Sequence, residues 1–293
     1  MTQKDKVQPS TSPPDGKRLG QLMDRYRREV NFTRSLRLKT PLSLGLLVFL
    51  LVTHTLASMM DMVLQVADRR VVPAILHGAN IDFLVWEGQW WRLISATFLH
   101  GGWLHLVFNA YALYVLGPVL ERLYGSRRFV VLYVGAGLLA SLASLWLTGR
   151  SVGASGAIFG LLGALMAFGL RHRQKLPPKV GKAFGVGMLP WVVINIGIGF
   201  IPGLQIDNAA HIGGLIAGAL LALPMSTTLE AEPLRWRRAG LEVLFLVSML
   251  LVSWGLVGML HQAMRCTSSV QSAMVCYPLD KIQPEQTPDQ PEP

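Results

Sequence analysis

The stretch "GASGAIFGLLGALMAFGL", residues 153–170, contains only small and apolar residues apart from one hydroxyl side chain, that of Ser155. A helix that crosses a membrane needs roughly 20 mostly apolar residues, and this stretch comes close to that length. Stretches of similar character lie at about 41–60, 103–121, 129–148, 183–201, 209–225 and 239–261. The sequence therefore predicts an all-α polytopic membrane protein with seven spans.

The composition agrees with this fold class. Hydrophobic residues make up 51% of the 293 residues and charged residues only 15%, whereas soluble domains carry about 25% charged residues. The net charge of +10 could indicate a nucleic-acid partner. However, the basic residues sort by loop and do not gather with aromatic residues on one soluble face, so we expect the lipid bilayer as a partner and no nucleic acid.

The distribution of basic residues predicts the topology. With a cytoplasmic N-terminus, 21 of the 27 Lys and Arg residues lie on the cytoplasmic side, and the positive-inside rule then gives an N-in/C-out arrangement. The first 40 residues are polar, so the span at 41–60 reads as a signal anchor and not as a cleavable signal peptide. No transit peptide precedes it, which favours a bacterial inner membrane.

The chain divides into five regions on these grounds. They are a basic cytoplasmic N-terminal tail (1–40), a six-span core (41–225), a cytoplasmic linker (226–238), a seventh transmembrane helix (239–261) and a partly disordered extracytoplasmic tail (262–293). The outer tail holds both cysteines of the chain, Cys266 and Cys276. A disulfide between them and two free thiols are both compatible with the sequence.

Two groups of charged and aromatic residues outside the spans have simple interpretations. Residues 61–102 mix charged and apolar side chains, so we expect this segment along the outer membrane interface, with Trp90, Trp91 and Trp103 as anchors. At the inner end of the second span, Glu121 and Arg122 are expected to form a solvated cap.

Polar side chains from three spans share one depth in the membrane. His105 and Asn109 lie four residues apart in the second span, Ser155 begins the fourth, and His211 lies near the start of the sixth. All three spans descend from the outer side, which places these four side chains roughly 5–10 Å below the surface. Polar groups at such depth are costly and indicate function.

Small residues show how these spans could meet. Gly156 and Gly160 form a GxxxG pattern in the fourth span, and Gly214 and Gly218 form another in the sixth. Small residues let two backbones approach closely within lipid. Such an approach is what a hydrogen bond between Ser155 and His211 requires.

These residue types fit nucleophilic catalysis. A serine hydroxyl becomes an effective nucleophile when an adjacent imidazole takes its proton. The Asn109 amide, the His105 ring and the Ser155 backbone N–H are donors of the kind that stabilises an oxyanion. Asp207 could orient His211, but it would lie a turn nearer the surface, so the sequence favours a dyad without a third acid.

The motifs resemble those of the rhomboid family of intramembrane serine proteases. They are "GQWWRLISATFLHGGWLHLVFNAYALYVLG" at 88–117, "GASGAIFG" at 153–160 and "DNAAHIGGLIAG" at 207–218. The resemblance implies a six-helix transmembrane bundle plus a seventh C-terminal helix (6+1). It also implies that Ser155 is the nucleophile and His211 the general base, and that His105 and Asn109 line the oxyanion hole.

The same resemblance implies supporting roles for further residues. Phe159 would pack on the catalytic imidazole, Arg92 belongs to a Trp-Arg pair in the first extramembrane loop, and His100 would be structural. The remaining supporting residues are the motif glycines Gly153, Gly156 and Gly214.

The function implied by this resemblance is hydrolysis of a peptide bond in or near the transmembrane segment of single-pass membrane proteins, at a site facing the extracytoplasmic side. No metal or organic cofactor is expected. The alternative is a catalytically silent relative that binds transmembrane clients; such a protein would typically lack the Ser or the His. A zinc site formed by His100, His105 and His211 is disfavoured, because the chain has no H-E-x-x-H motif.

Overall fold

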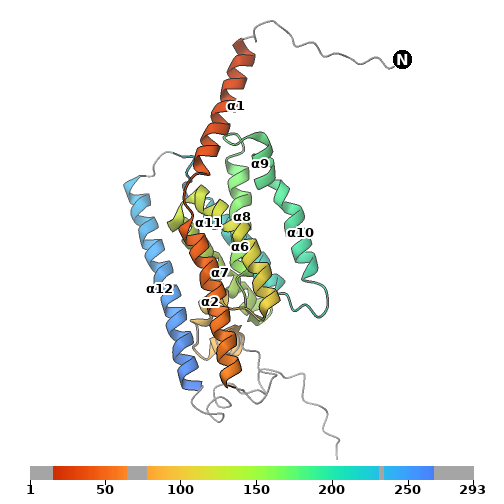
Figure 1. Cartoon of the computed structure of the whole chain (residues 1–293), viewed down its shortest axis with the longest axis vertical. Helices are drawn as coiled ribbons and strands as arrows, with labels where there is room; N and C mark the ends of the chain where they lie inside the picture. The colour runs from red at the N-terminus through yellow and green to blue at the C-terminus, as the bar shows by residue number, and fades with distance from the viewer. Residues whose placement is uncertain (1–15, 65–77, 231–233, 267–293) are drawn as a thin grey trace, which may run out of the picture.

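The computed structural model describes residues 16–64, 78–230 and 234–266, and nearly all of its regular structure is helical (Figure 1). The first elements are α1 (Gly16–Ser35), α2 (Pro41–Leu64), β1 (Asn80–Ile81), α4 (Asp82–Trp86), α5 (Arg92–Ser95), the 3₁₀ helix η1 (Ala96–Phe98), α6 (Trp103–Tyr124) and α7 (Ser126–Leu147). The others are β2 (Arg150–Ser151), α8 (Ser155–Arg171), α9 (Pro178–Phe184), the 3₁₀ helix η2 (Val186–Met188), α10 (Leu189–Ile198), α11 (Asn208–Ala222) and α12 (Arg235–Cys266).

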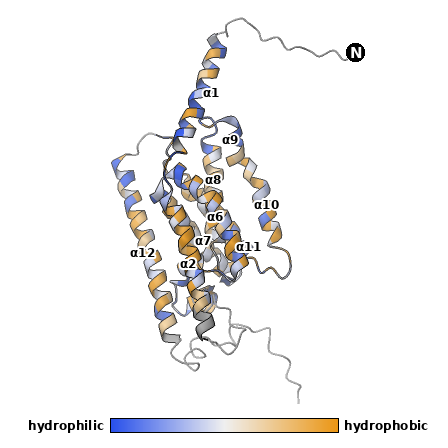
Figure 2. Ribbon diagram, in the orientation of Figure 1, coloured by the Kyte–Doolittle hydropathy of each residue, from blue (hydrophilic) through white to orange (hydrophobic). Residues whose placement is uncertain are grey.

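Four of these helices, α2, α6, α7 and α12, are long and apolar enough to cross a membrane. Orange, apolar residues run along α2 and α12 in Figure 2, and exposed side chains such as Leu246, Leu250 and Val257 make up much of the surface of α12. An apolar exterior of this kind matches lipid. The chain is therefore an integral membrane protein.

Of the two shorter apolar helices, α8 lies inside the bundle, whereas α11 packs against it and keeps exposed apolar side chains such as Ile216 and Leu220. Thirteen of the 17 residues of α8 are buried, and the helix packs against α6, α7 and α11. A helix surrounded by protein can begin and end inside the bundle, because protein groups can satisfy the backbone at its ends. The sequence predicted α8 and α11 as spans, and the structure makes both shorter than α2, α6, α7 and α12.

Glycines let α8 and α11 pack backbone against backbone. A Cβ added to Gly214 would collide with the carbonyl oxygen of Gly156, and one added to Gly218 would collide with that of Gly160. A Cβ at Gly160 would lie 3.2 Å from the carbonyl oxygen of Gly214. The two GxxxG patterns predicted from the sequence thus face each other in the structure.

Three features differ from the sequence-based expectations. The expected span at 183–201 is a bent pair instead: α9 and the η2–α10 segment meet at 49°, where Gly185 (φ −86°, ψ −114°) interrupts the helix and Pro190 opens α10. The expected linker at 226–238 is partly helical, because α12 begins at Arg235. The N-terminal tail contains α1, which was not predicted. Cys276 lies outside the described residues.

Glu121 is not part of a solvated cap, and that prediction is wrong. Its side chain is 1% exposed and accepts hydrogen bonds from the backbone N–H groups of Leu42 (3.1 Å) and Ser43 (2.7 Å) and from the Ser126 hydroxyl (2.6 Å). The first N–H groups of a helix lack intrahelical partners. Glu121 at the end of α6 therefore caps the start of α2 and joins α2, α6 and α7.

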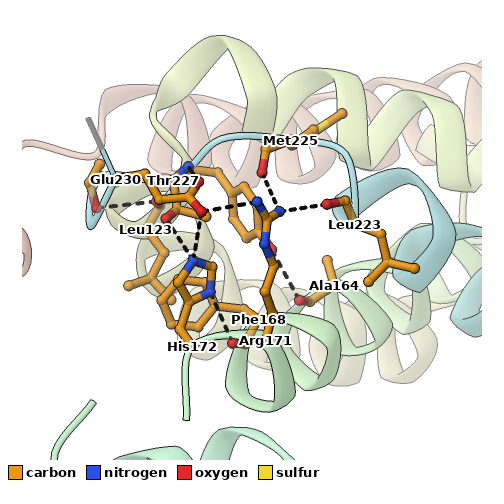
Figure 3. Close-up of polar contacts among 11 residues, drawn as sticks. Leu123, Ala164, Phe168, Arg171, His172, Leu223, Met225, Thr227 and Glu230 are labelled. Atoms are coloured by element: carbon orange, nitrogen blue, oxygen red, sulfur yellow. Dashed lines mark hydrogen bonds and ion pairs between the residues drawn. The ribbon is translucent and has the colours of Figure 1, made fainter. Parts of the chain in front are cut away.

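A second polar cluster lies at the end of α8 opposite Ser155 (Figure 3). The Glu230 carboxylate forms an ion pair with Arg171 (2.9 Å) and accepts a hydrogen bond from the Thr227 N–H (3.0 Å), and the Nε2 atom of His172 lies 3.3 Å from it. Arg171 also donates to backbone carbonyls of the turn after α11. The Glu230 cluster thus joins the end of α8 to the exit of α11.

The Glu230 cluster predicts a dependence of stability on pH. Partial burial alone would raise the pKa of the Glu230 carboxyl, but the Thr227 N–H, Arg171 and His172 outweigh it and hold the pKa below its ordinary value of 4.5. A lowered folded-state pKa stabilises the fold above pH 4.5, and this contribution is lost as the pH falls further. In detergent, the free energy of unfolding should fall more steeply below pH 4.5 for the wild type than for Glu230→Gln. The exposed control Glu87→Gln should keep the wild-type slope; a Glu230→Gln slope equal to wild type would contradict the prediction.

The glycine packing predicts a large difference between two substitutions. Gly218→Val should lower the free energy of unfolding by at least about 1–3 kcal/mol, because its Cβ meets the α8 backbone, which cannot move aside like a flexible side chain. Gly45→Ala should be neutral or mildly stabilising, since nothing lies within 4 Å of the added Cβ. Equilibrium unfolding in detergent measures both, and equal effects would argue against backbone packing of α8 on α11.

Candidate active site

Ser155 and His211 meet at the start of α8 and α11. Ser155 is the first residue of α8, and His211 lies in the first turn of α11. The His211 Nε2 atom is 2.9 Å from the Ser155 hydroxyl oxygen, within hydrogen-bonding distance. The glycine contacts between the two helices make this distance possible. The pair can therefore exchange a proton along one hydrogen bond.

Phe159 packs on the face of the His211 imidazole ring. Its ring lies one turn beyond Ser155 on α8 and stacks on the His211 ring, with a centroid separation of 4.1 Å and an interplanar angle of 10°. His211 is 7% exposed. The stacking restricts the ring to one plane, and in that plane Nε2 points at Ser155.

Asp207 caps the start of α11 and makes no hydrogen bond to the His211 imidazole. Its Oδ1 atom accepts a hydrogen bond from the Ala210 N–H (3.0 Å), which makes Asp207 the N-cap of α11. The Nδ1 atom of His211 is buried and has no hydrogen-bond partner among the described residues. Ser155 and His211 thus form a hydrogen-bonded pair, and in the described part of the chain no third side chain forms a hydrogen bond with His211 Nδ1.

His105 and Asn109 lie beside the turn that leads into Ser155. A Cβ added to Gly153 would lie 2.7 Å from Nε2 of His105 and 3.7 Å from Nδ2 of Asn109. The Asn109 amide donates to the His105 carbonyl oxygen (3.1 Å). An amide has two N–H donors, so a second one can point toward a ligand at Ser155.

The turn before Ser155 is held by the segment between α2 and α6. The Gly153 N–H donates to the carbonyl oxygen of Ala96 in η1 (2.9 Å). Nearby, β1 and β2 form an antiparallel pair in which Asn80 faces Ser151, and the Asn80 amide donates to the Ser141 carbonyl oxygen (2.9 Å). Residues 78–98 therefore hold the turn that leads into Ser155 in place.

Arg92 stabilises this support from the inside. Its side chain is fully buried; it donates to the Ala79 carbonyl oxygen (3.0 Å) and to the Gln89 side chain (2.7 Å), and it lies over the Trp91 ring. Trp91 is only 8% exposed. The prediction that Trp91 anchors the chain in the membrane interface is therefore wrong, since protein covers the ring, whereas Trp90 and Trp103 remain exposed.

A row of histidine rings continues from the site, and one of its members was missed in the sequence. The centroid of the buried His100 ring lies 5.2 Å from the His105 ring centroid and 6.2 Å from that of His54 in α2. The His54 ring packs edge-on against Trp103. His54 could have been found as an ionisable residue within the apolar stretch 41–60. In the described part of the chain, no three or more His, Cys, Asp or Glu side chains are arranged to hold a metal ion.

Comparison with known proteins identifies the family. Residues 87–228 match the model of the Rhomboid domain. The chain is also 36% identical over 139 residues to YdcA of Bacillus subtilis (strain 168), an alignment that covers 46% of this chain and 67% of YdcA. The chain belongs to the rhomboid family.

Relatives of this rhomboid include proteins named as proteases. It is 37% identical over 202 residues to the rhomboid protease GluP of Bacillus subtilis (strain 168), covering 69% of this chain and 37% of GluP. It is 36% identical over 177 residues to the rhomboid protease AarA of Providencia stuartii, covering 53% of this chain and 63% of AarA. The chain thus spans less than two thirds of the length of either protease.

Gly153 offers a test of how the site is assembled. Its φ of +128° disfavours any residue with a side chain, and an added Cβ would strike the His105 ring. Gly153→Ala should therefore reduce labelling of Ser155 by a fluorophosphonate on the order of 10²-fold, since a shift of about 1 Å at a reacting group can cost that much. Gly197→Ala, where nothing lies within 4 Å, is the matched control. Equal labelling of the two variants would contradict the role given to Gly153.

Proposed function

We propose that this rhomboid is an intramembrane serine endopeptidase with Ser155 as the nucleophile and His211 as the general base. The observation that supports this most is the 2.9 Å contact between the Ser155 hydroxyl and His211 Nε2. In the proposed topology this contact lies within the membrane, where an isolated polar pair would be costly to retain. The proteases GluP and AarA among the relatives agree with this reading.

The proposed reaction has two halves. Nε2 of His211 takes the proton of the Ser155 hydroxyl while its oxygen attacks the carbonyl carbon of the scissile peptide bond, which gives a tetrahedral oxyanion. The C–N bond then breaks, and the imidazolium gives its proton to the leaving amine. Water repeats the sequence on the acyl-enzyme and releases the carboxylic acid, returning the proton to Ser155.

The oxyanion is proposed to lie between α6 and the start of α8. Three donors surround this position: the Asn109 amide, the His105 ring and the Ser155 backbone N–H. Donors that are already in place before the reaction lower its barrier, because they need not reorient as charge develops. Gly153 lacks a side chain that would fill this space.

The proposed topology has six core spans plus α12, an N-in/C-out orientation and an active site on the extracytoplasmic side. The distribution of the 27 Lys and Arg residues supports this orientation. In this topology the helices of Ser155 and His211 descend from the extracytoplasmic side, so the water that the reaction needs would enter from there. A bacterial inner membrane is the proposed location, in keeping with the bacterial relatives GluP and AarA.

The proposed substrates are single-pass membrane proteins, cut in or near their transmembrane segment. Exposed apolar side chains cover much of α2 and α12, so we expect lipid around the bundle and a membrane-embedded chain as the molecule that approaches it laterally. The competing function is binding of transmembrane clients without cleavage. The Ser155–His211 contact favours the protease, because a binding protein has no need of this hydrogen bond.

Covalent labelling separates these functions without knowledge of the substrate. The purified wild type should react with a fluorophosphonate probe, and both Ser155→Ala and His211→Ala should abolish the reaction while remaining folded, because each removes one partner of the proton transfer. In-gel fluorescence measures the labelling. A folded wild type that does not react would contradict the protease and favour the client-binding protein.

Asn109 should have a smaller effect than the dyad. Asn109→Ala removes one proposed oxyanion donor and should lower the rate of peptide-bond cleavage on the order of 10²–10³-fold. Cleavage of a transmembrane reporter protein in detergent measures this rate. Asn195→Ala is the matched control, because the Asn195 amide donates to its own helix on an exposed face of α10. A wild-type rate in Asn109→Ala would exclude Asn109 from the oxyanion hole.

A further inference from the structure

Two glycines of α12 lie against the support of the active site. A Cβ added to Gly258 would lie 2.8 Å from Cδ1 of the Trp91 indole and closer still to two other atoms of the ring. A Cβ added to Gly255 would lie 3.1 Å from the Ile94 side chain and 3.3 Å from the Ser95 backbone nitrogen. The glycines therefore form a notch in α12, and Trp91 and α5 fit into it.

The notch forms one of the two main contacts that α12 makes with the bundle. Only 11% of the most apolar window of α12 is buried, and within the described residues the helix packs mainly against α5 and α7. Trp91 and Ile94 are both buried. The helix α12 touches little protein, yet its glycines make room for Trp91 and α5. Trp91 and α5 are therefore a specific contact of α12.

The notch connects to Ser155 through a short chain of contacts. Trp91 precedes α5, and α5 continues directly into η1. The carbonyl oxygen of Ala96 in η1 accepts the Gly153 N–H at 2.9 Å. Gly153 lies two residues before Ser155 and against the His105 ring. A displacement of Trp91 can thus reach the turn that sets the Ser155 backbone.

We propose that α12 is a positioning element for the active site: the notch at Gly255 and Gly258 fixes Trp91 and α5, and through Ala96 it holds the Gly153 turn beside His105. This inference rests on the proposed function for its effect on reactivity. Its structural part, the coupling of Gly258 to the Gly153 N–H, does not depend on catalysis.

The test compares two substitutions in the same helix. Gly258→Leu fills the notch, whereas Gly240→Leu adds the same side chain where nothing lies within 4 Å. Hydrogen exchange of the full-length protein in detergent, read by mass spectrometry on peptides that span 150–156, reports the Gly153 N–H. Gly258→Leu should raise exchange in this segment on the order of tenfold, and Gly240→Leu should leave it within about twofold of wild type.

Reactivity is measured on the same samples with a fluorophosphonate at several concentrations. Gly258→Leu should lower the maximal labelling rate on the order of tenfold and leave the probe concentration for half-maximal rate unchanged, because orientation at Ser155 changes and probe binding does not. Measurements are made on the folded fraction after size exclusion, well below each melting temperature. Gly240→Leu should label as wild type.

A double variant tests whether Trp91 carries the effect. If Gly258→Leu acts by displacing the indole, then Trp91→Leu, which shortens that side chain, should make the second substitution far less harmful. The effects of the two changes on exchange in 150–156 should be clearly less than additive. Additive effects would mean that the notch acts elsewhere.

The outcomes separate the two proposals. A Gly258→Leu variant with a lower melting temperature but wild-type exchange in 150–156 and wild-type labelling would overturn the positioning role, since α12 would then only stabilise the bundle. Raised exchange in 150–156 with a wild type that never labels would support the positioning role and overturn the protease. Raised exchange with a reduced maximal labelling rate supports both.

Discussion

The backbone contact between α8 and α11 is the constraint on which the rest of the structure depends. Glycines at 156, 160, 214 and 218 remove the side chains that would otherwise separate the two helices. Without a hydrophobic force between helices in lipid, such close packing is a main source of association. It also places Ser155 and His211 2.9 Å apart, so one feature serves both stability and the proposed chemistry. A single added methyl group at this interface would act on both at once.

Two polar clusters connect the ends of neighbouring helices in the bundle. Glu121 joins α2, α6 and α7 through three short hydrogen bonds, and the Glu230 cluster joins the end of α8 to the exit of α11. Glu121 is buried, and a buried carboxylate destabilises the fold unless it is paired. The Glu230 cluster therefore helps to fix α8 and α11 along their axes, while the glycines set the distance between these two helices.

Residues 78–98 provide a second level of support for the site. This segment contains Arg92, which is fully buried, and the Ala96 carbonyl oxygen, which accepts a hydrogen bond from the Gly153 N–H. Its conformation is held from one side by β2 and from the other by the glycine notch of α12. The largely exposed helix α12 is therefore linked to the turn before Ser155. A site at the end of a helix needs such external support, because the first turn of a helix has few hydrogen bonds of its own.

The sequence by itself determined the fold class, most of the helical segments and the four polar residues of the candidate site, because apolar length and motif spacing are local properties of the chain. It also identified the GxxxG patterns, although it could not show that they face each other. Only the tertiary structure decided which polar residues are buried and what they contact: Glu121 caps α2, Asp207 caps α11, Trp91 packs into α12, and His54 joins the row of histidine rings. The bend between α9 and α10 was also beyond the sequence. These outcomes depend on partners that are distant in the chain, and a residue's burial is set by those partners and not by its neighbours in sequence.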